Sequence, residues 1–536
     1  MLYIRGDGIG LTKPAKVSQP QLNYMDPRPS VLKSPLQEIC FQFIICMAQF
    51  LAQGSIAMSL STMNIVSDSF GALQGKKIET SQTIWFMGLY ALTLGTFILV
   101  SGRLGDLFGL RKMFLFGWFW AALWCIVTGL SYYSKSTVFF ITCRALQGVG
   151  FAFILPCGMG ILGTVYPPGK RKNLAFAFVG ASAPVGATIG VLMAAVVSQF
   201  VWWCWAFWLL GIACVLLGVL AIYAIPGKFK HHDYTIKEAY EKFDLCGSVV
   251  GICGLILFNF VWNQGPVVGW SSPYIIVLLV VSVALIIGFF YLELKVVKYP
   301  LLPREIFTLR IGLVLLCMSL GWGLFGIWQY YYWCFLLNLR GYTPIAASLT
   351  YFPLFILGIV AALLVGFCIN KRRAPFIVFA SMMGFMLGSI ILSIIPVNQT
   401  FWRLTFAQMF FLAWGMDCSF PAASLILSDF LPSEHQGMAG SLVNTVVNYS
   451  VSLFLAISST VEIQVHQKAH DTLKSYRSAI YLGIGISALA VLTSVVFIIT
   501  EHRNHKHEAA LLELSETAET GETLISEKPQ EHKASP

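Results

Sequence analysis

Charged residues are scarce in this sequence. Lys, Arg, Asp and Glu make up only 11% of the 536 residues, whereas apolar residues make up 57%. Soluble domains carry about 25% charged residues, so the composition excludes an ordinary soluble protein. Apolar runs of membrane-spanning length recur from about residue 40 to about residue 500. The composition therefore predicts one all-α polytopic domain whose main surroundings are a lipid bilayer.

The patterns of soluble enzymes and nucleic-acid-binding proteins are also missing. The 13 cysteines include no Cys-x-x-Cys pair, which argues against a metal centre or a disulfide framework. The sequence contains no phosphate-binding loop and no nucleophile–base arrangement, so we expect no enzyme activity and no cofactor. The formal charge of +10 comes from short loops on one side of the predicted spans. It therefore indicates membrane orientation, and we expect no nucleic-acid partner.

The apolar runs predict about fourteen transmembrane helices, with both tails polar. The seventh is the weakest prediction, because Asn259 and Asn263 shorten its apolar run. The predicted spans lie near Ile39–Ser61, Ile84–Val100, Met113–Leu130, Val138–Thr164, Leu174–Val197, Trp203–Ile225, Leu245–Trp262, Tyr274–Leu292, Ile311–Leu336, Ile345–Phe367, Phe376–Ile395, Leu404–Leu427, Met438–Ser459 and Ala479–Thr500.

Lys and Arg are concentrated in alternate loops, and that asymmetry orients the chain. The richer side is predicted to be cytoplasmic, which places both tails inside. The chain then divides into a disordered tail over 1–38, a six-helix half over 39–225, cytoplasmic loops with two inserted helices over 226–310, a second six-helix half over 311–500, and a disordered tail over 501–536. The basic clusters of the richer side are Arg103, Arg111, Lys112, Lys170, Arg171, Lys172, Lys228, Lys230, Lys237, Lys242, Lys295, Lys298, Arg304, Arg310, Lys371, Arg372 and Arg373.

The charged turn from Gly102 to Lys112 joins the second and third predicted spans. Its three spaced glycines remove side chains, so that a neighbouring helix end can approach the backbone closely. Its carboxylate is suited to accept hydrogen bonds from the free N–H groups of a helix N-terminus. A solvated basic turn is the simpler interpretation, but it does not account for this combination. The residues that define it are Gly102, Gly105, Asp106, Gly109, Arg111 and Lys112.

The fourth span contains Arg144, with Gln147 and Gly148 on the same helical face. An arginine inside the bilayer costs at least about 2.5 kcal/mol, so it needs a polar cavity or acceptors. Two interpretations stay open: a structural arginine that donates to backbone carbonyls, and a residue that handles substrate or protons.

The fifth span carries Pro184, Gly186 and Gly190, which permit a kink or close helix packing. A packing face and a transport role are both consistent with this stretch. In the first span Gln53 occupies a candidate cavity position. Since glutamine does not titrate, it cannot carry a proton.

Asp417, in the twelfth span, is the clearest acid inside a predicted helix. As a desolvated carboxyl group it is a candidate proton carrier, unless its helix is shifted towards the interface. Asn444 and Asn448 belong to a polar stripe on the thirteenth span, which suits either helix–helix hydrogen bonding or a cavity wall. Gln329 lies in an aromatic stripe of the ninth span, where packing is the simpler explanation.

Together, the 102–112 turn and the Arg144–Gly150 stretch resemble signatures of the major facilitator superfamily of transporters. Gln53, Gly95–Leu99, Pro168–Asn173 and Gly180–Pro184 resemble a fungal fourteen-helix branch containing aminotriazole-resistance, boron-export and low-affinity ammonium transport proteins. The fifth span departs from the antiporter signature, with Ala183 before Pro184.

The resemblance implies two six-helix halves with two inserted helices and alternating access, with the 102–112 turn acting in gating. It implies a monomeric, multi-pass protein of the plasma membrane, or alternatively of the vacuolar membrane, that moves a small molecule or ion. Our leading hypothesis is export of a small toxic or polar solute, with protons as a candidate coupling ion. The alternatives are an ammonium or small-solute facilitator and a non-transporting receptor.

The first prediction concerns topology. If the charge asymmetry sets the orientation, Asn398, in the sequon Asn398-Gln399-Thr400, faces outside and is the glycosylation candidate. A C-terminal tag should resist protease added to intact cells and become cleavable after permeabilisation. Cleavage of the tag in sealed cells would contradict the fourteen-span orientation.

Overall fold

The fold is entirely helical in the part of the chain that the structure describes. The computed structural model describes residues 28–78, 80–167, 169–227, 238, 242–302, 304–369, 373–430 and 436–526. Within these ranges, fourteen helices are long and apolar enough to cross a bilayer. The predicted all-α architecture with fourteen spans is therefore confirmed.

Six long helices form the N-terminal half. They pack closely on one another, with α1 against α5, α2 against α4 and α3 against α4 and α6. The first starts where Ser34 accepts a hydrogen bond from the backbone N–H of Gln37, and it stops at Gly75 in the left-handed region. The elements are α1 (Pro35–Gln74), α2 (Thr80–Phe108), α3 (Leu110–Leu130), the short turn η1 (Ser131–Ser134), α4 (Thr137–Val165), α5 (Lys170–Phe200) and α6 (Trp203–Ala224).

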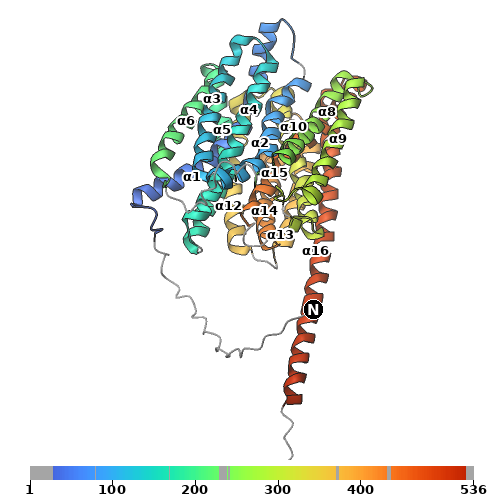
Figure 1. Cartoon of the computed structure of the whole chain (residues 1–536). Helices are drawn as coiled ribbons and strands as arrows, with labels where there is room; N and C mark the ends of the chain where they lie inside the picture. Colours follow the sequence, from blue (N-terminus) through green and yellow to red (C-terminus); the bar gives the residue numbers. More distant parts are fainter. Residues whose placement is uncertain are drawn as a thin grey trace, which may run out of the picture.

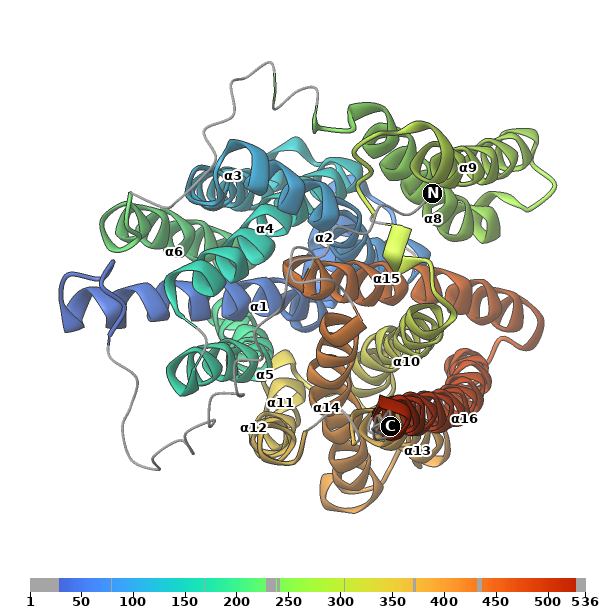
Figure 2. The same ribbon diagram turned by 60° about the horizontal axis from the view of Figure 1, so that its bottom comes forward.

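The C-terminal half repeats this arrangement, and the inserted pair stands beside the two halves. Figure 2 shows the inserted helices α8 and α9 at the edge of the bundle. The inserted elements are α8 (Leu245–Val268), α9 (Pro273–Tyr291), η2 (Leu292–Val296) and η3 (Arg304–Ile306). The C-terminal elements are α10 (Leu309–Cys334), η4 (Phe335–Leu339), α11 (Pro344–Leu349), α12 (Phe352–Cys368), α13 (Ala374–Ile394), η5 (Phe401–Thr405), α14 (Phe406–Phe430), α15 (Gln436–Ala469) and α16 (Thr472–Ser526).

The two halves meet along two pairs of helices. In one, α2 of the N-terminal half packs against α15, and in the other α5 packs against α11 and α12. The end of α16 projects from one face of the bundle, at the bottom of Figure 1. We call this the cytoplasmic face and the opposite one the outer face, after the charge-based prediction.

The seventh span is longer than predicted. Instead of ending at Trp262, α8 continues to Val268, because its two asparagines are buried and paired. The Asn263 amide donates to Asn259 Oδ1 at 3.0 Å, and Asn259 donates to Ser452 Oγ of α15 at 3.1 Å. Satisfied in this way, the amides attach the inserted pair to the C-terminal half.

Two other helix ends also differ from the prediction. The thirteenth span continues ten residues beyond Ser459, to Ala469. Residues 501–526, expected as a disordered tail, extend α16 as a helix to Ser526. The expected N-terminal tail lies outside the described residues from 1 to 27. Polar residues ended the predicted spans too early, because a helix can continue beyond the bilayer core.

Glycines bring α1 and α5 into backbone contact. A Cβ atom added at Gly186 would lie 2.6 Å from Phe50 Cα, and one added at Gly190 would lie 2.5 Å from Gly54 Cα. Such spacing of small residues four apart allows helices to approach closely in membranes. The close packing expected around Pro184 is therefore built by these two glycines, and the proline itself lies inside a continuous α5.

The second prediction tests this crossing. Gly186→Ala should lower the thermal stability of the purified protein, because the new methyl group overlaps the α1 backbone and overpacking costs about 1–3 kcal/mol. The control is Gly180→Ala on the same helix, where an added Cβ meets nothing within 4 Å. Equal melting temperatures for the two variants in detergent would contradict the close α1–α5 contact.

Candidate functional site

Three glycines of α2, seven residues apart, lie in the contact between α2 and α15. At Gly95 an added Cβ would lie 2.6 Å from the backbone nitrogen of Tyr449, so only glycine fits there. Seven residues before and after Gly95 the helices are further apart, because an added Cβ at either glycine would lie 3.7 Å from the nearest α15 atom, a serine Oγ. These looser pairs are Gly88 with Ser452 and Gly102 with Ser441. The two halves therefore approach each other along α2 from Gly88 to Gly102.

Hydrogen bonds join the halves at the outer face. Thr83 Oγ1 of α2 and Tyr330 Oη of α10 lie 2.7 Å apart, and both side chains are buried. The Asn64 amide of α1 donates to Asn338 Oδ1 of η4 at 2.8 Å. Since α2 and α15 also touch at Gly102, near the cytoplasmic face, the two halves are in contact at both ends.

The 102–112 turn is a one-residue connection. Gly109 has a φ of +104°, where side chains are strained, and it alone separates α2 from α3. A Cβ at Gly105 would lie 2.9 Å from Cys157 Sγ of α4. The Arg111 guanidinium donates to the Ile222 carbonyl oxygen at 2.7 Å, near the C-terminus of α6, where positive charge is favourable. Asp106 and Lys112 are exposed.

Arg144 is completely buried in the N-terminal half. Its Nε donates to the Phe86 carbonyl oxygen at 3.2 Å, and the remaining four N–H groups reach Ser55, Ser59 and Gln147. Ser55 accepts through Oγ at 3.1 Å and through its carbonyl oxygen at 2.7 Å, and Ser59 Oγ accepts at 2.6 Å. All five donors are thus used, by neutral acceptors on α1, α2 and α4.

Aromatic rings complete the surroundings of this guanidinium. The ring centroids of Tyr90 and Phe207 lie 4.7 and 5.6 Å from its central carbon. Gln147 accepts one of its hydrogen bonds and donates to Cys125 Sγ at 2.9 Å. Gly148 permits close contact between α4 and α2, because an added Cβ would lie 2.6 Å from the Tyr90 carbonyl oxygen.

Asp417 occupies a junction between the halves. A Cβ added at Gly358 of α12 would lie 2.5 Å from Asp417 Oδ2 and 3.1 Å from Pro184 Cβ of α5. Within the described residues Oδ2 is buried and accepts no hydrogen bond. The structure does not bring Asp417 into contact with Arg144, whose donors all point into α1, α2 and α4.

Comparison with known sequences decides the family. The profile of the Major Facilitator Superfamily matches residues 45–455. The chain belongs to this superfamily of transporters. It is 43% identical to a low affinity ammonium transporter of Saccharomyces cerevisiae, over 89% of this chain and 91% of that one. It is 46% identical to an aminotriazole resistance protein of the same yeast, over 88% and 86% of the two chains.

A fungal efflux pump gives the same assignment, and a solved transporter structure shares the fold. The efflux pump terJ of Aspergillus terreus is 38% identical, over 87% of this chain and 89% of that one. A crystal structure of a peptide transporter, with alafosfalin bound, matches with a TM-score of 0.61 at 14% identity, over 86% and 94% of the chains. The chain is thus a multi-pass major facilitator transporter related to fungal efflux proteins, and not an enzyme.

The remaining polar candidates of this transporter lie in different surroundings. Asn444 and Asn448 donate to carbonyl oxygens of their own helix, at Gly440 and Asn444 respectively. Gln53 is half-buried on α1. Gln329 is buried on α10, within an aromatic stripe that packs inside the C-terminal half. Asn398 is exposed in the loop after α13.

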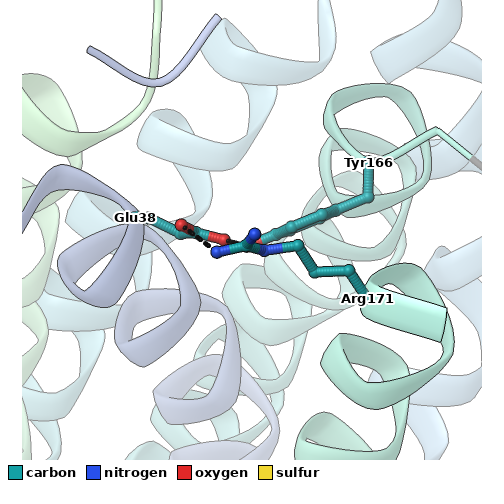
Figure 3. A network of polar contacts seen from close by, with 3 residues as sticks. All are labelled: Glu38, Tyr166 and Arg171. Atoms are coloured by element: carbon teal, nitrogen blue, oxygen red, sulfur yellow. Dashed lines mark hydrogen bonds and ion pairs between the residues drawn. The ribbon is translucent and has the colours of Figure 1, made fainter. Parts of the chain in front are cut away.

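Sequence reasoning missed a buried polar network at the cytoplasmic face, drawn in Figure 3. The Arg171 Nε of α5 donates to Glu38 Oε1 at 2.8 Å, its Nη2 donates to Oε2 at 2.9 Å, and the Tyr166 hydroxyl donates to Oε1 at 3.0 Å. Burial, together with the Glu38 hydrogen bond, raises the pKa of Tyr166 above its usual value, which keeps this donor protonated. Arg310 and Glu501 form a second pair at 3.1 Å, between α10 and α16.

The pair of Glu38 and Arg171 could have been recognised from charge placement. Glu38 precedes the apolar run of α1, and Arg171 begins that of α5, so both fall at the same membrane face. The sequence could not show that α1 and α5 are neighbours. Their glycines allow the two helices to pack against each other. Neither ion pair crosses between the halves: Glu38–Arg171 joins helices of the N-terminal half, and Arg310–Glu501 joins helices of the C-terminal half.

The third prediction concerns the Arg144 cluster. Ser59→Ala should destabilise the transporter by about 1–3 kcal/mol, because it leaves a buried guanidinium N–H without an acceptor. Ser61→Ala is the matched control, since Ser61 is equally buried on α1 but donates only to the Met58 carbonyl oxygen of its own helix. The measurement is the thermal unfolding midpoint in detergent. A larger shift for Ser61→Ala than for Ser59→Ala would contradict the structural role of Arg144.

Proposed function

We propose that this transporter exports a small toxic or polar solute, of the drug or boron type, by alternating access, and that protons drive it. Support comes from its relatives, one named for aminotriazole resistance and another as an efflux pump. We further propose the plasma membrane as its location, with the vacuolar membrane as the alternative, and a monomeric state.

The observation that carries the coupling proposal is the position of Asp417. Its Oδ2 is buried against Gly358 of α12 and close to Pro184 of α5, where the two halves touch. When the halves separate at this junction, water reaches the carboxyl group, and when they close, water is removed. Because desolvation disfavours the charged form of a carboxyl group, closing of the halves around Asp417 is coupled to the uptake of a proton.

Two other features fit this scheme. Gln53 cannot titrate, so the first helix supplies no proton site at that position. We propose that the 102–112 turn acts in gating, because Gly102 lies where α2 meets α15 near the cytoplasmic face. In this proposal Asp106 stabilises the closed cytoplasmic arrangement through the residues that face it.

A facilitator is the second candidate, since a close relative is named a low affinity ammonium transporter. A facilitator needs no titrating group, so it would move its solute only downhill. A non-transporting receptor on the same fold is the third candidate, and it would show no flux at all. Direct measurement of flux separates all three.

The fourth prediction tests export and its coupling. Cells lacking related transporters, with and without this protein, are loaded with aminotriazole, boric acid or methylammonium, and efflux is followed under an imposed proton gradient. Wild-type protein should expel one of these solutes against its gradient. Asp417→Asn should abolish uphill export while downhill exchange continues, because the neutral amide cannot carry a proton.

Asp429→Asn is the control for this experiment. Asp429 lies on the same helix as Asp417, but its side chain is exposed, so the variant should export as wild type does. Unchanged uphill export by Asp417→Asn would exclude Asp417 as the proton carrier. Purely downhill movement that ignores the proton gradient would favour the facilitator, and absence of any flux above cells without the protein would favour the receptor.

A further inference from the structure

A second buried carboxyl group lies in the part of α15 that the sequence placed outside the membrane. Glu462 is only 5% exposed. Its Oε2 is buried and accepts no hydrogen bond from the described residues. It continues the buried face of α15 that includes Val451, Leu455 and Ser458, at the spacing of one helical stripe. A functional proposal based on Asp417 leaves this group without a role.

Among the described residues, no cation pairs with Glu462. The titratable groups close enough to interact with it are Tyr331 and Cys334 from α10 and Tyr476 from α16. His466, one turn further along α15, is exposed. No ion pair of Glu462 occurs among the described residues. A carboxylate buried without a cation is strongly unfavourable, so this pocket suits a neutral, protonated carboxyl group.

Two of these side chains contact the residues that close the outer face. Tyr476 Oη accepts a hydrogen bond from the Asn338 amide at 2.9 Å, and Asn338 Oδ1 accepts from Asn64 of the N-terminal half at 2.8 Å. Tyr331 packs edge-on against Tyr330, with ring centroids 5.3 Å apart. Tyr330 is the residue that bonds Thr83 of α2.

Two routes therefore lead from Glu462 to the contacts between the halves. One passes through Tyr476 and Asn338 to α1, and the other through Tyr331 and Tyr330 to α2. We propose that Glu462 is a proton-binding site that controls the outer closure of the transporter: the protonated form permits closure, and the ionised form requires the outer ends of the halves to part.

The physical link is hydration. An ionised Glu462 needs water or a cation, and its described neighbours supply no cation, so in this proposal ionisation draws water from the outer solution between α10, α15 and α16. That water displaces Tyr331 and Tyr476, which lead to the contacts with α2 and α1. A proton taken up from the outer solution converts the carboxylate to the neutral acid and restores closure. By linkage, closure and protonation favour each other reciprocally. The inference rests on the proposed function only in requiring that the two halves move, and it is independent of the solute.

Spin-label distances across the outer face test the proposal without any solute. Ala72, near the end of α1, and Lys474, near the start of α16, are exposed and would be changed to Cys for labelling. The exposed Cys246 and Cys253 would be changed to Ser. In nanodiscs, the population with a long distance between the labels should grow as pH rises and shrink again on acidification. Glu462→Gln should lose this pH response and keep the short distance throughout.

Glu293→Gln is the matched control, because Glu293 is also fully buried but belongs to η2 of the inserted pair. It should keep the wild-type response. Tyr476→Phe removes the hydroxyl acceptor of Asn338 and should increase the long-distance population at acid pH. A wild-type pH response retained in Glu462→Gln, or no response in wild type, would overturn the proposal.

Loss of folded Glu462→Gln protein at acid pH would also contradict the proposal, because the amide mimics the neutral acid. The flux experiment on Asp417 is read separately. If the protein exports none of the solutes, the label distances still test the role of Glu462. If the label response of Glu462→Gln is unchanged, the proposal for Glu462 fails, but the export proposal does not.

Discussion

The buried guanidinium of Arg144 is the constraint on which the N-terminal half depends. Its five N–H groups need five acceptors, and α1, α2 and α4 supply all of them. Moving any one of these helices away would leave a buried charged donor unpaired, which is far costlier than losing an exposed contact. The cluster therefore favours movement of the half as a rigid body, with α1 and α5 held together by their glycines and by the Arg171–Glu38 pair.

The described hydrogen bonds that join the halves at the outer face are of a weaker kind. Asn64 with Asn338 and Thr83 with Tyr330 are neutral hydrogen bonds, each of which contributes only about 0.5–1.5 kcal/mol net. Close backbone approach at Gly95 adds packing without adding charge. Charged interactions inside each half, together with neutral hydrogen bonds between the halves at the outer face, suit alternating access, because the halves must separate there repeatedly without unfolding.

The sequence predicted the fold well because spanning a bilayer is a one-dimensional constraint on apolar length. It identified fourteen spans, and the polar residues inside them, but not which partners those residues meet. Arg144 illustrates the limit: its cost in the membrane was readable, whereas its acceptors Ser55 and Ser59 depend on how α1 packs. Glu462 was missed because a polar C-terminal turn looks like a helix end, and only the packing of α10 and α16 shows that it is buried.

The two halves differ in the buried ionisable groups that they contain. The N-terminal half holds a buried cation, Arg144, whose five donors all have acceptors. The C-terminal half holds Asp417 and Glu462, and one buried oxygen of each carboxyl group accepts no hydrogen bond from the described residues. These two groups lie at different contacts, one near α5 and one behind the outer closure. In the coupling proposed above, a change in charge at either group would alter the cost of closing its own contact, so protonation at the two sites would favour different states of the same two halves.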